Sequence, residues 1–232
     1  MATAYFMRLV IEMTDAAADQ EHIPMVVYSR PQTPDRTRYL LGQSPEDPVP
    51  AMAECGQRLQ ADGADVAAIP CITAHALHDR IQRQVGIPIL HAIRETAGLL
   101  QEKGIRRVAL EATGGTVETR VFQEELEKRQ MEVILPSPPG QRDVMDIIYQ
   151  NIKAGKPADM EKFCRVEAQL LERGAQIIIL GCTELSMIKR DYALRPCYLD
   201  TLEVLARAAV LECGKLRPEY EDLLKDVRSG KG

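Results

Sequence analysis

Hydrophobic positions follow two alternating patterns along the chain. Short and nearly continuous apolar runs, such as "QIIILG" at 176–181, are typical of strands that are covered on both faces of a sheet. Between these runs lie stretches with helical spacing, for example residues 93–103 and 159–173. Strands that alternate with helices of about 10–15 residues indicate parallel βαβ units. The pattern therefore predicts an α/β protein whose sheets are parallel and flanked by helices.

The expected elements cover most of the chain. Strands are expected at 23–29, 64–70, 88–92, 106–113, 131–137, 176–181 and 196–200. Helices are expected near 3–18, 50–62, 93–103, 117–129, 143–153, 159–173 and 201–214, with a further helix after Cys71. The charged segment 217–232 is expected to be a solvated tail.

An internal repeat is the most informative feature of this pattern. The segments "LQADGADVAAIPC" (59–71) and "LLERGAQIIILGC" (170–182) share a leucine, a Gly-Ala pair and a final cysteine at equal spacing. In each copy a threonine follows the cysteine within two residues. The repeat predicts a pseudo-twofold pair of α/β domains. It also places both cysteines at the carboxyl ends of strands, where open α/β sheets bind ligands.

Composition and charge narrow the possible partners. The chain has 232 residues, of which 45% are hydrophobic and 27% charged, so it is long enough for one large domain or two small ones. The net charge is −5 with acids and bases interspersed, which does not predict nucleic-acid binding. No apolar run approaches the roughly 20 residues that span a bilayer. The first residues lack the basic region of a signal peptide, so a cytoplasmic protein is expected.

The six cysteines are widely spaced. They form no C-x-x-C pair and no close His/Cys cluster, so a metal site is not expected. Disulfides are not expected in a reducing compartment. Cys55, Cys164 and Cys213 fall in expected helices and Cys197 in a short strand, which indicates packing roles.

Cys71 and Cys182 stand apart because the repeat presents them as a pair. Taken alone, Cys71 fits a small buried hydrophobic residue equally well. A thiol that precedes a helix, however, meets backbone N–H groups that favour the thiolate. Two thiols on opposite walls of a cleft could serve as general base and general acid in the inversion of a carbon acid. No nucleotide-binding glycine motif and no convincing lysine for pyridoxal phosphate are present, so no cofactor is expected.

Two further segments carry candidate binding residues. In "EATGGTVE" (111–118) the hydroxyls of Thr113 and Thr116 and the Gly-rich backbone could bind a carboxylate at a helix N-terminus. A tight turn with a threonine cap explains the same segment equally well. In the loop "RPQTPDRTR" Arg36 could hold a carboxylate, although a solvated loop arginine is the commoner case.

On these residues the chain resembles the aspartate/glutamate racemase family of cofactor-independent amino-acid racemases. The resemblance runs over nearly the whole chain and rests on "TDAAADQEHIPMVVYSRPQTPDRT", "IPCITAH", "ATGGTV", "IYQNIKAGK", "GAQIIILGCTEL" and "LDTLEVLARAAV", in the family's order. The paired cysteine segments are its specific part. It implies two pseudo-symmetric α/β domains with the active site between them, in a homodimer. The domains are expected at 1–94 with 205–232, and at 95–204.

The resemblance also implies roles for individual residues. Cys71 and Cys182 would be the acid/base thiols that act on a small amino-acid substrate. Four threonines would line the pocket and two basic residues would lie near the substrate carboxylates; these are Thr73, Thr113, Thr116 and Thr183, and Arg36 and Lys153. Glu184, in "GCTEL", would be a further substrate-binding residue. It resembles the aspartate-type or broad-specificity branch, whereas glutamate racemases typically have histidine there.

Two differences from the family bear on substrate and fold. The family usually has Cys-Asn-Thr at the first cysteine, and its asparagine bonds the substrate, but here the middle residue is Ile72. A substrate group left unpaired would cost about 1–3 kcal/mol. In the family a strand and a Gly-rich loop precede the helix equivalent to "ATAYFMRLV". Either the first domain lacks that strand, or the strand lies before the start of the given sequence.

Three alternatives follow from the same features. A related enzyme could use both thiols on another substrate, as a hydantoin racemase or maleate isomerase does. A malonate decarboxylase-like activity is a weaker match, because that branch has one of the two cysteines. A non-catalytic binding protein with the racemase fold would be consistent with Ile72 and the missing strand.

Overall fold

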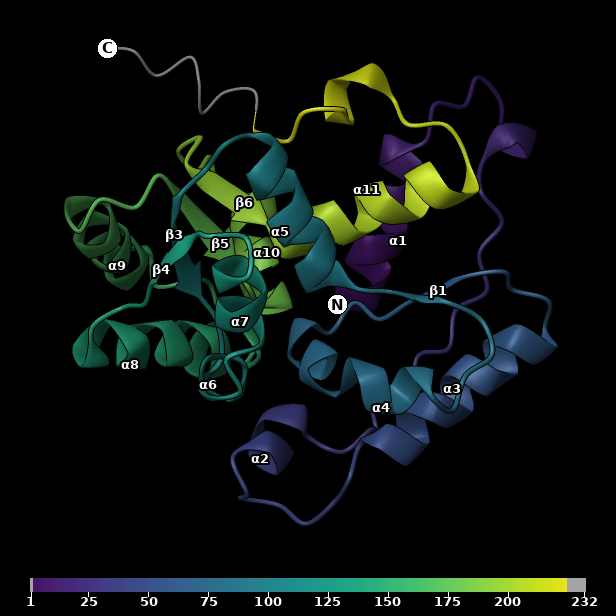
Figure 1. Ribbon diagram of the computed structural model, residues 1–232, viewed down its shortest axis with the longest axis horizontal. Coiled ribbons are helices and arrows are strands. Elements are labelled where there is room, and N and C mark those ends of the chain that lie inside the picture. The colour runs from purple at the N-terminus through teal and green to yellow at the C-terminus, as the bar shows by residue number, and fades with distance from the viewer. Residues whose placement is uncertain (1, 225–232) are drawn as a thin grey trace.

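The computed structural model describes residues 2–224, arranged as two α/β halves that share a set of central helices (Figure 1). The strands are β1 Ala67–Ala68, β2 Ile89–Leu90, β3 Arg107–Glu111, β4 Glu132–Ile134, β5 Ile177–Leu180 and β6 Tyr198–Asp200. The helices are α1 Ala2–Met13, α2 Arg36–Leu40, α3 Val49–Ala61, α4 His78–Gln82, α5 Ala92–Glu102, α6 Gly114–Glu118, α7 Val121–Glu127, α8 Pro138–Asp146, α9 Met160–Glu172, α10 Thr183–Asp191 and α11 Thr201–Cys213. Short 3₁₀ turns form η1 Asp19–Glu21, η2 Ile72–Leu77 and η4 Pro218–Tyr220, and a π-helical turn forms η3 Ile147–Ile152.

The second sheet has four parallel strands in the order β4-β3-β5-β6. Its strands are covered on both faces, as the continuous apolar run of β5 predicts. Ile177 and Ile179 face the larger core cluster with α5, α7 and α11. Ile178 and Leu180 face the opposite cluster, which is filled by α8, η3, α9 and α10. This alternation makes the second half a three-layer unit with no exposed sheet face.

The first sheet has two parallel strands among the described residues, β1 and β2. Ala67 and Ile89 pack against α3 and α4, while Ala68 and Leu90 pack against the larger core cluster. The helices α1 and α11 pack against each other, and α11 also packs against α5 (Figure 1). The predicted α/β class with parallel sheets in two halves is confirmed.

The internal repeat forms the same backbone turn in both halves. At the end of α3 the Ala64 amide bonds the Leu59 carbonyl at 3.0 Å, and at the end of α9 the Ala175 amide bonds the Leu170 carbonyl at 3.2 Å. The repeated glycine takes a left-handed conformation in each case, with φ of +90° and +85°. Only glycine adopts this conformation without strain. Each turn therefore ends a helix and directs the chain into the strand that leads to a cysteine.

The segment 23–29 was expected to be a strand, and this prediction is wrong. No strand of the described chain pairs with it, since β1 and β2 pair only with each other there. A strand needs a neighbour for its backbone N–H and C=O groups. Ile23 and Met25 still pack against the larger core cluster, whereas Val26 is 51% exposed.

Three helix predictions needed correction. The helix expected at 3–18 ends at Met13, because Thr14 leaves it to form an isolated bridge with Leu216. The helix expected at 117–129 is divided into α6 and α7 by Arg120, whose φ is +54°. The helix expected at 143–153 begins earlier, as α8, and continues as the π-helical turn η3.

The segment 217–232 was expected to be a solvated tail, and this is wrong for its described part. The Arg217 guanidinium donates to the Thr14 carbonyl at 2.9 Å, and Leu224 is only 3% exposed. Its apolar residues therefore pack against the core. Residues 225–232 lie outside the described part of the chain.

The predicted domain boundaries at 94/95 and 204/205 fall inside α5 and α11, and the division into 1–94 with 205–232 and 95–204 stays a prediction.

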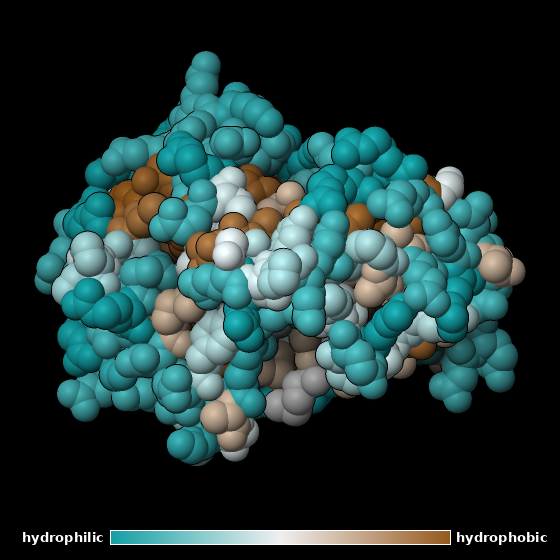
Figure 2. Space-filling view, turned by 90° about the horizontal axis from the view of Figure 1, so that it is seen from below, coloured by the Kyte–Doolittle hydropathy of each residue, from teal (hydrophilic) through white to brown (hydrophobic). Residues whose placement is uncertain are grey.

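The face seen in Figure 2 is mostly hydrophilic, with hydrophobic residues gathered mainly between polar side chains. Within residues 2–224, no helix has the length and apolar composition to cross a membrane.

Candidate active site

A cavity of about 1210 Å³ lies between the two halves. Eight of the nine predicted site residues line it: Arg36, Cys71, Thr73, Thr113, Lys153, Cys182, Thr183 and Glu184. They come from both halves of the repeat and from the connecting segments. The cavity continues along α1 and the extended segment 23–30.

Cys71 lies at the end of the first-sheet strand segment, where it is the residue before η2. The Arg36 Nε donates to the Cys71 Sγ at 3.4 Å. Two backbone carbonyls, those of Thr33 and Pro34, hold the same guanidinium at 3.2 and 3.0 Å. Burial acts to lower the pKa of Arg36, but the nearby sulfur and carboxylates outweigh it and raise the pKa. A fixed cation thus lies against the Cys71 sulfur.

Cys182 is the residue before α10 and is only 5% exposed. Its Sγ donates to the Glu184 Oε2 at 2.9 Å. Burial raises the pKa of the Cys182 thiol well above its ordinary value, and the charge and hydrogen bond of Glu184 raise it further. The Glu184 backbone amide and the Lys153 ammonium act in the opposite direction. A carboxylate thus lies against the Cys182 sulfur.

Lys153 follows the π-helical turn η3. Its amide bonds the Ile148 carbonyl at 2.9 Å, a spacing of five residues, and such π turns often occur at functional sites. The Lys153 Nζ lies 4.2 Å from the centre of the Tyr149 ring, a cation–π contact. Burial acts to lower the pKa of Lys153, but Glu184 and other neighbours raise it overall. Lys153 therefore supplies a second cation to the cavity.

Three of the predicted threonines form a hydroxyl network between the halves. Thr73, Thr113 and Thr116 are joined in a triangle, with each pair of Oγ1 atoms 3.1 Å apart. Thr37 from α2 adds a contact of 3.4 Å to Thr113. Thr116 is fully buried and does not line the cavity. Thr183 lies on the other side and donates to the Glu184 carboxylate at 3.3 Å.

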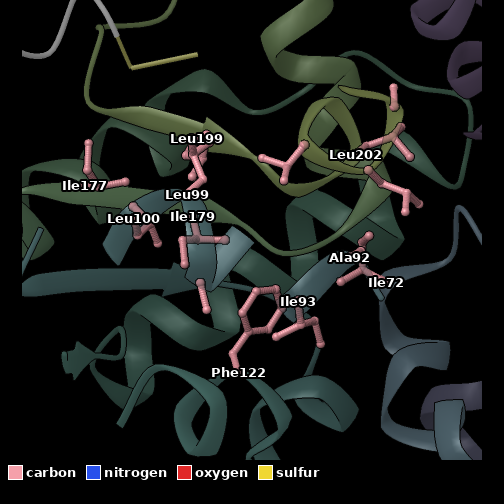
Figure 3. Packing of buried hydrophobic residues seen from close by; sticks show 14 of the residues in the cluster. Ile72, Ala92, Ile93, Leu99, Leu100, Phe122, Ile177, Ile179, Leu199 and Leu202 are labelled. Atoms are coloured by element: carbon pink, nitrogen blue, oxygen red, sulfur yellow. The ribbon is translucent and has the colours of Figure 1, made fainter. Parts of the chain in front are cut away.

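Ile72 borders the cavity but belongs mainly to the core. Its side chain is 2% exposed, and Figure 3 places it at one end of the buried cluster, next to Ala92. This packing gives Ile72 a structural role. A buried isoleucine supplies no hydrogen bond to a substrate, so the expectation that a substrate group is left unpaired there stays a prediction.

Two site residues were not found from the sequence. Asp35 lines the cavity and caps α2 by accepting from the Arg38 amide at 3.0 Å. Tyr149 supports the ammonium of Lys153. The cap was visible as an aspartate at the start of a helical stretch, whereas the π turn that brings Tyr149 under Lys153 has no signature in the sequence. Among the described residues, no three His, Cys, Asp or Glu side chains are grouped so that they could hold a metal ion.

The comparison with protein families gives one match over most of the chain. The family described as Asp/Glu/Hydantoin racemase matches residues 1–209. The chain is also similar to the "Broad specificity amino-acid racemase RacX" of Bacillus subtilis, with 25% identity over 160 residues, 69% of this chain and 70% of that protein.

Solved structures show the same fold. The aspartate racemase of Picrophilus torridus superposes with a TM-score of 0.81 and 27% identity, covering 96% of this chain and 94% of that chain. An aspartate racemase homologue of Pyrococcus horikoshii superposes with a TM-score of 0.72 and 23% identity, over 91% of this chain and 93% of that one. Because this identity is only 23%, the similarity to the Pyrococcus horikoshii structure concerns the fold alone.

Proposed function

Because the chain belongs to the Asp/Glu/Hydantoin racemase family, we propose that it racemises an amino acid by proton transfer between Cα and the thiols of Cys71 and Cys182. The observation that carries the proposal is that both cysteines line one cavity. They also end equivalent segments of the internal repeat. Such thiols approach a bound substrate from different halves of the protein.

The reaction needs only two proton transfers. The thiolate of one cysteine takes the proton from Cα, and the electron pair of that C–H bond delocalises into the α-carboxylate. The thiol of the other cysteine then gives its proton to the opposite face of Cα, which inverts the centre. The first sulfur ends protonated and the second ends as the thiolate, so the reverse reaction uses the same pair with exchanged roles. No electron acceptor is required, and the proposal includes no cofactor.

Two cations in the cavity favour a substrate that carries a negatively charged group. Arg36 and Lys153 both line the cavity, and a guanidinium or ammonium stabilises a carboxylate and the negative charge that develops on it. Thr73, Thr113 and Thr183 add hydroxyl groups on the same surface. We propose an aspartate-like or broad specificity, in line with the aspartate racemase and the broad-specificity amino-acid racemase that the chain resembles.

The test is a panel of L- and D-amino acids followed by chiral chromatography. At least one acidic or neutral amino acid should be racemised, and Cys71→Ser and Cys182→Ser should each lower the rate by about 10³-fold, because each removes a general acid/base. Cys164→Ser is the matched control, since Cys164 is exposed and does not line the cavity. Full activity in either variant of the pair would contradict the two-thiol proposal.

A second substrate class is tested in the same panel. The family description includes hydantoin racemases, so 5-substituted hydantoins are included. Racemisation of hydantoins alone would keep the thiol chemistry and change the substrate. A folded, reduced protein that acts on none of these compounds would favour the binding-protein alternative.

The assembly and location follow from the family resemblance. We propose a homodimer that works in the cytoplasm on a small-molecule substrate. Light scattering after size exclusion should give a mass near twice the 25.9 kDa of one chain.

A further inference from the structure

The two sulfurs of the cavity have neighbours of opposite charge. Arg36 donates from its Nε to the Cys71 sulfur, at 3.4 Å. The Cys182 sulfur itself donates, to the Glu184 carboxylate at 2.9 Å. The repeat makes the backbone of the two segments alike, so this difference comes from residues outside the repeated pattern.

Charge of this kind decides which sulfur holds a proton. A neighbouring cation favours a thiolate, whereas an adjacent carboxylate and burial favour the neutral thiol. Besides Arg36 and Glu184, the charged side chains that line the cavity are Lys153, Asp35, Arg30, Asp62, Asp65 and Glu212. Of these, Lys153 and Asp35 interact with the groups around the two sulfurs. Lys153 follows η3, which packs against α10, and interacts with both Glu184 and Cys182. Asp35 lies beside Arg36 and interacts with both cations.

We propose that Glu184 is a positioning residue that keeps Cys182 protonated in the empty site, while Cys71 beside Arg36 carries the thiolate. This inference rests on the racemase function proposed above. In contrast with the substrate contact implied by the family resemblance, it gives Glu184 a role that acts through Cys182. It makes the empty enzyme ready for the enantiomer whose Cα–H faces Cys71.

The empty enzyme therefore always returns to the same protonation state, whichever enantiomer it last converted. After one turnover from that enantiomer, Cys71 holds the proton and Cys182 is a thiolate next to the Glu184 carboxylate. Two adjacent negative charges are unfavourable, so Cys182 regains a proton from solvent and Cys71 releases one. Racemisation has an equilibrium constant of one, which forces equal kcat/KM in both directions. The asymmetry therefore shows in kcat and KM taken separately.

The test measures the thiols without any substrate. The full chain is treated with iodoacetamide over a pH series, and alkylation of each cysteine is followed by peptide mass spectrometry. In the unmodified protein Cys71 should react faster than Cys182 at neutral pH. In Glu184→Gln the midpoint of the Cys182 profile should move down by about one pH unit, which gives about tenfold faster alkylation below the midpoint.

Two control variants separate the effect of the Glu184 charge from the access of iodoacetamide to the Cys182 sulfur. Glu184→Asp keeps a carboxylate and should restore the profile in part. Glu172→Gln removes an exposed carboxylate on α9, away from the cavity, and should change nothing. A uniformly faster reaction at every pH, with an unmoved midpoint, would mean better access only and would overturn the inference. Faster alkylation of Cys182 than of Cys71 in the unmodified protein would also overturn it.

This readout is independent of the proposed function. If the Cys182 midpoint moves as expected while no amino acid or hydantoin is racemised, the racemase proposal fails and the thiol–carboxylate pair stands. If racemisation is found and the midpoint does not move, the two-thiol function stands and the role of Glu184 is wrong.

Discussion

In each half of the molecule a helix ends at a left-handed glycine, a short strand follows, and a cysteine precedes the next helical turn. The surroundings of the two strands differ. β5 lies between β3 and β6 and is fully buried. β1 pairs on one side only among the described residues, with β2. Cys182 is consequently buried, while Cys71 is partly exposed.

The difference shows what a duplicated unit can and cannot supply. The repeat positions two sulfurs at equivalent points of two sheets. Their charge environment comes from elsewhere, because Arg36 lies on α2 and Lys153 follows η3. A symmetric backbone can therefore carry two thiols whose charge environments differ.

The buried titratable groups also differ between the halves. The first half has a histidine cluster, with the His78 and His91 rings 4.4 Å apart. Burial lowers the pKa of His75 to about 3. In the second half burial, together with the charge of Glu167, raises the pKa of Glu111 to about 8. Both Glu111 carboxyl oxygens are buried without a hydrogen-bond partner. The halves should thus respond to pH in opposite directions.

The largest expected effect concerns Glu111. Its pKa rises from 4.5 to about 8 on folding, so the folded chain binds the extra proton between those values. Stability should therefore fall as the pH rises from about 5 to 8, by on the order of 5 kcal/mol. Glu111→Gln should abolish this part of the pH dependence. Urea unfolding of both proteins at several pH values measures the difference.

The histidine cluster sharpens this comparison. Because the pKa of His75 is lowered, its contribution to stability is present above about pH 6.5 and is lost toward pH 3. Between pH 6.5 and 8 the His75 contribution is constant, and the remaining slope comes from Glu111 and from Asp200, whose pKa burial raises to about 7. An unchanged pH slope in Glu111→Gln would show that the second half does not bury an unpaired carboxyl.

A smaller effect on the free energy of unfolding is expected when equivalent positions of the repeat are replaced by alanine. Leu180 and Ile69 both lie two residues before their cysteine, but Leu180 is fully buried and Ile69 only partly. Leu180→Ala should lower the free energy of unfolding by about 3 kcal/mol, and Ile69→Ala by about 1 kcal/mol. Equal losses in urea unfolding would contradict the unequal packing of the two sheets.

The sequence predicted the features that depend on local pattern. The paired strand-to-cysteine segments, the parallel sheets and the threonine segment at 113–116 follow from spacing alone. The partner of the Cys71 sulfur was not predictable, since Arg36 reaches it from a segment that is distant in sequence. Glu184, the partner of Cys182, lies only two residues further along the chain. The π turn before Lys153 and the mutual bonding of the threonine hydroxyls likewise depend on tertiary packing. The segment 23–29 was misassigned because an apolar pattern alone does not ensure a pairing partner.

In the proposed reaction two opposed thiols exchange the Cα proton with solvent. The most direct measurement starts from one enantiomer of a racemised amino acid in deuterated water and follows both enantiomers by NMR and mass spectrometry. With a two-thiol mechanism the first product should carry one deuterium at Cα, while the remaining starting enantiomer keeps its hydrogen. Product that retains the original hydrogen would contradict it, and so would deuterium that enters the starting enantiomer faster than inversion occurs.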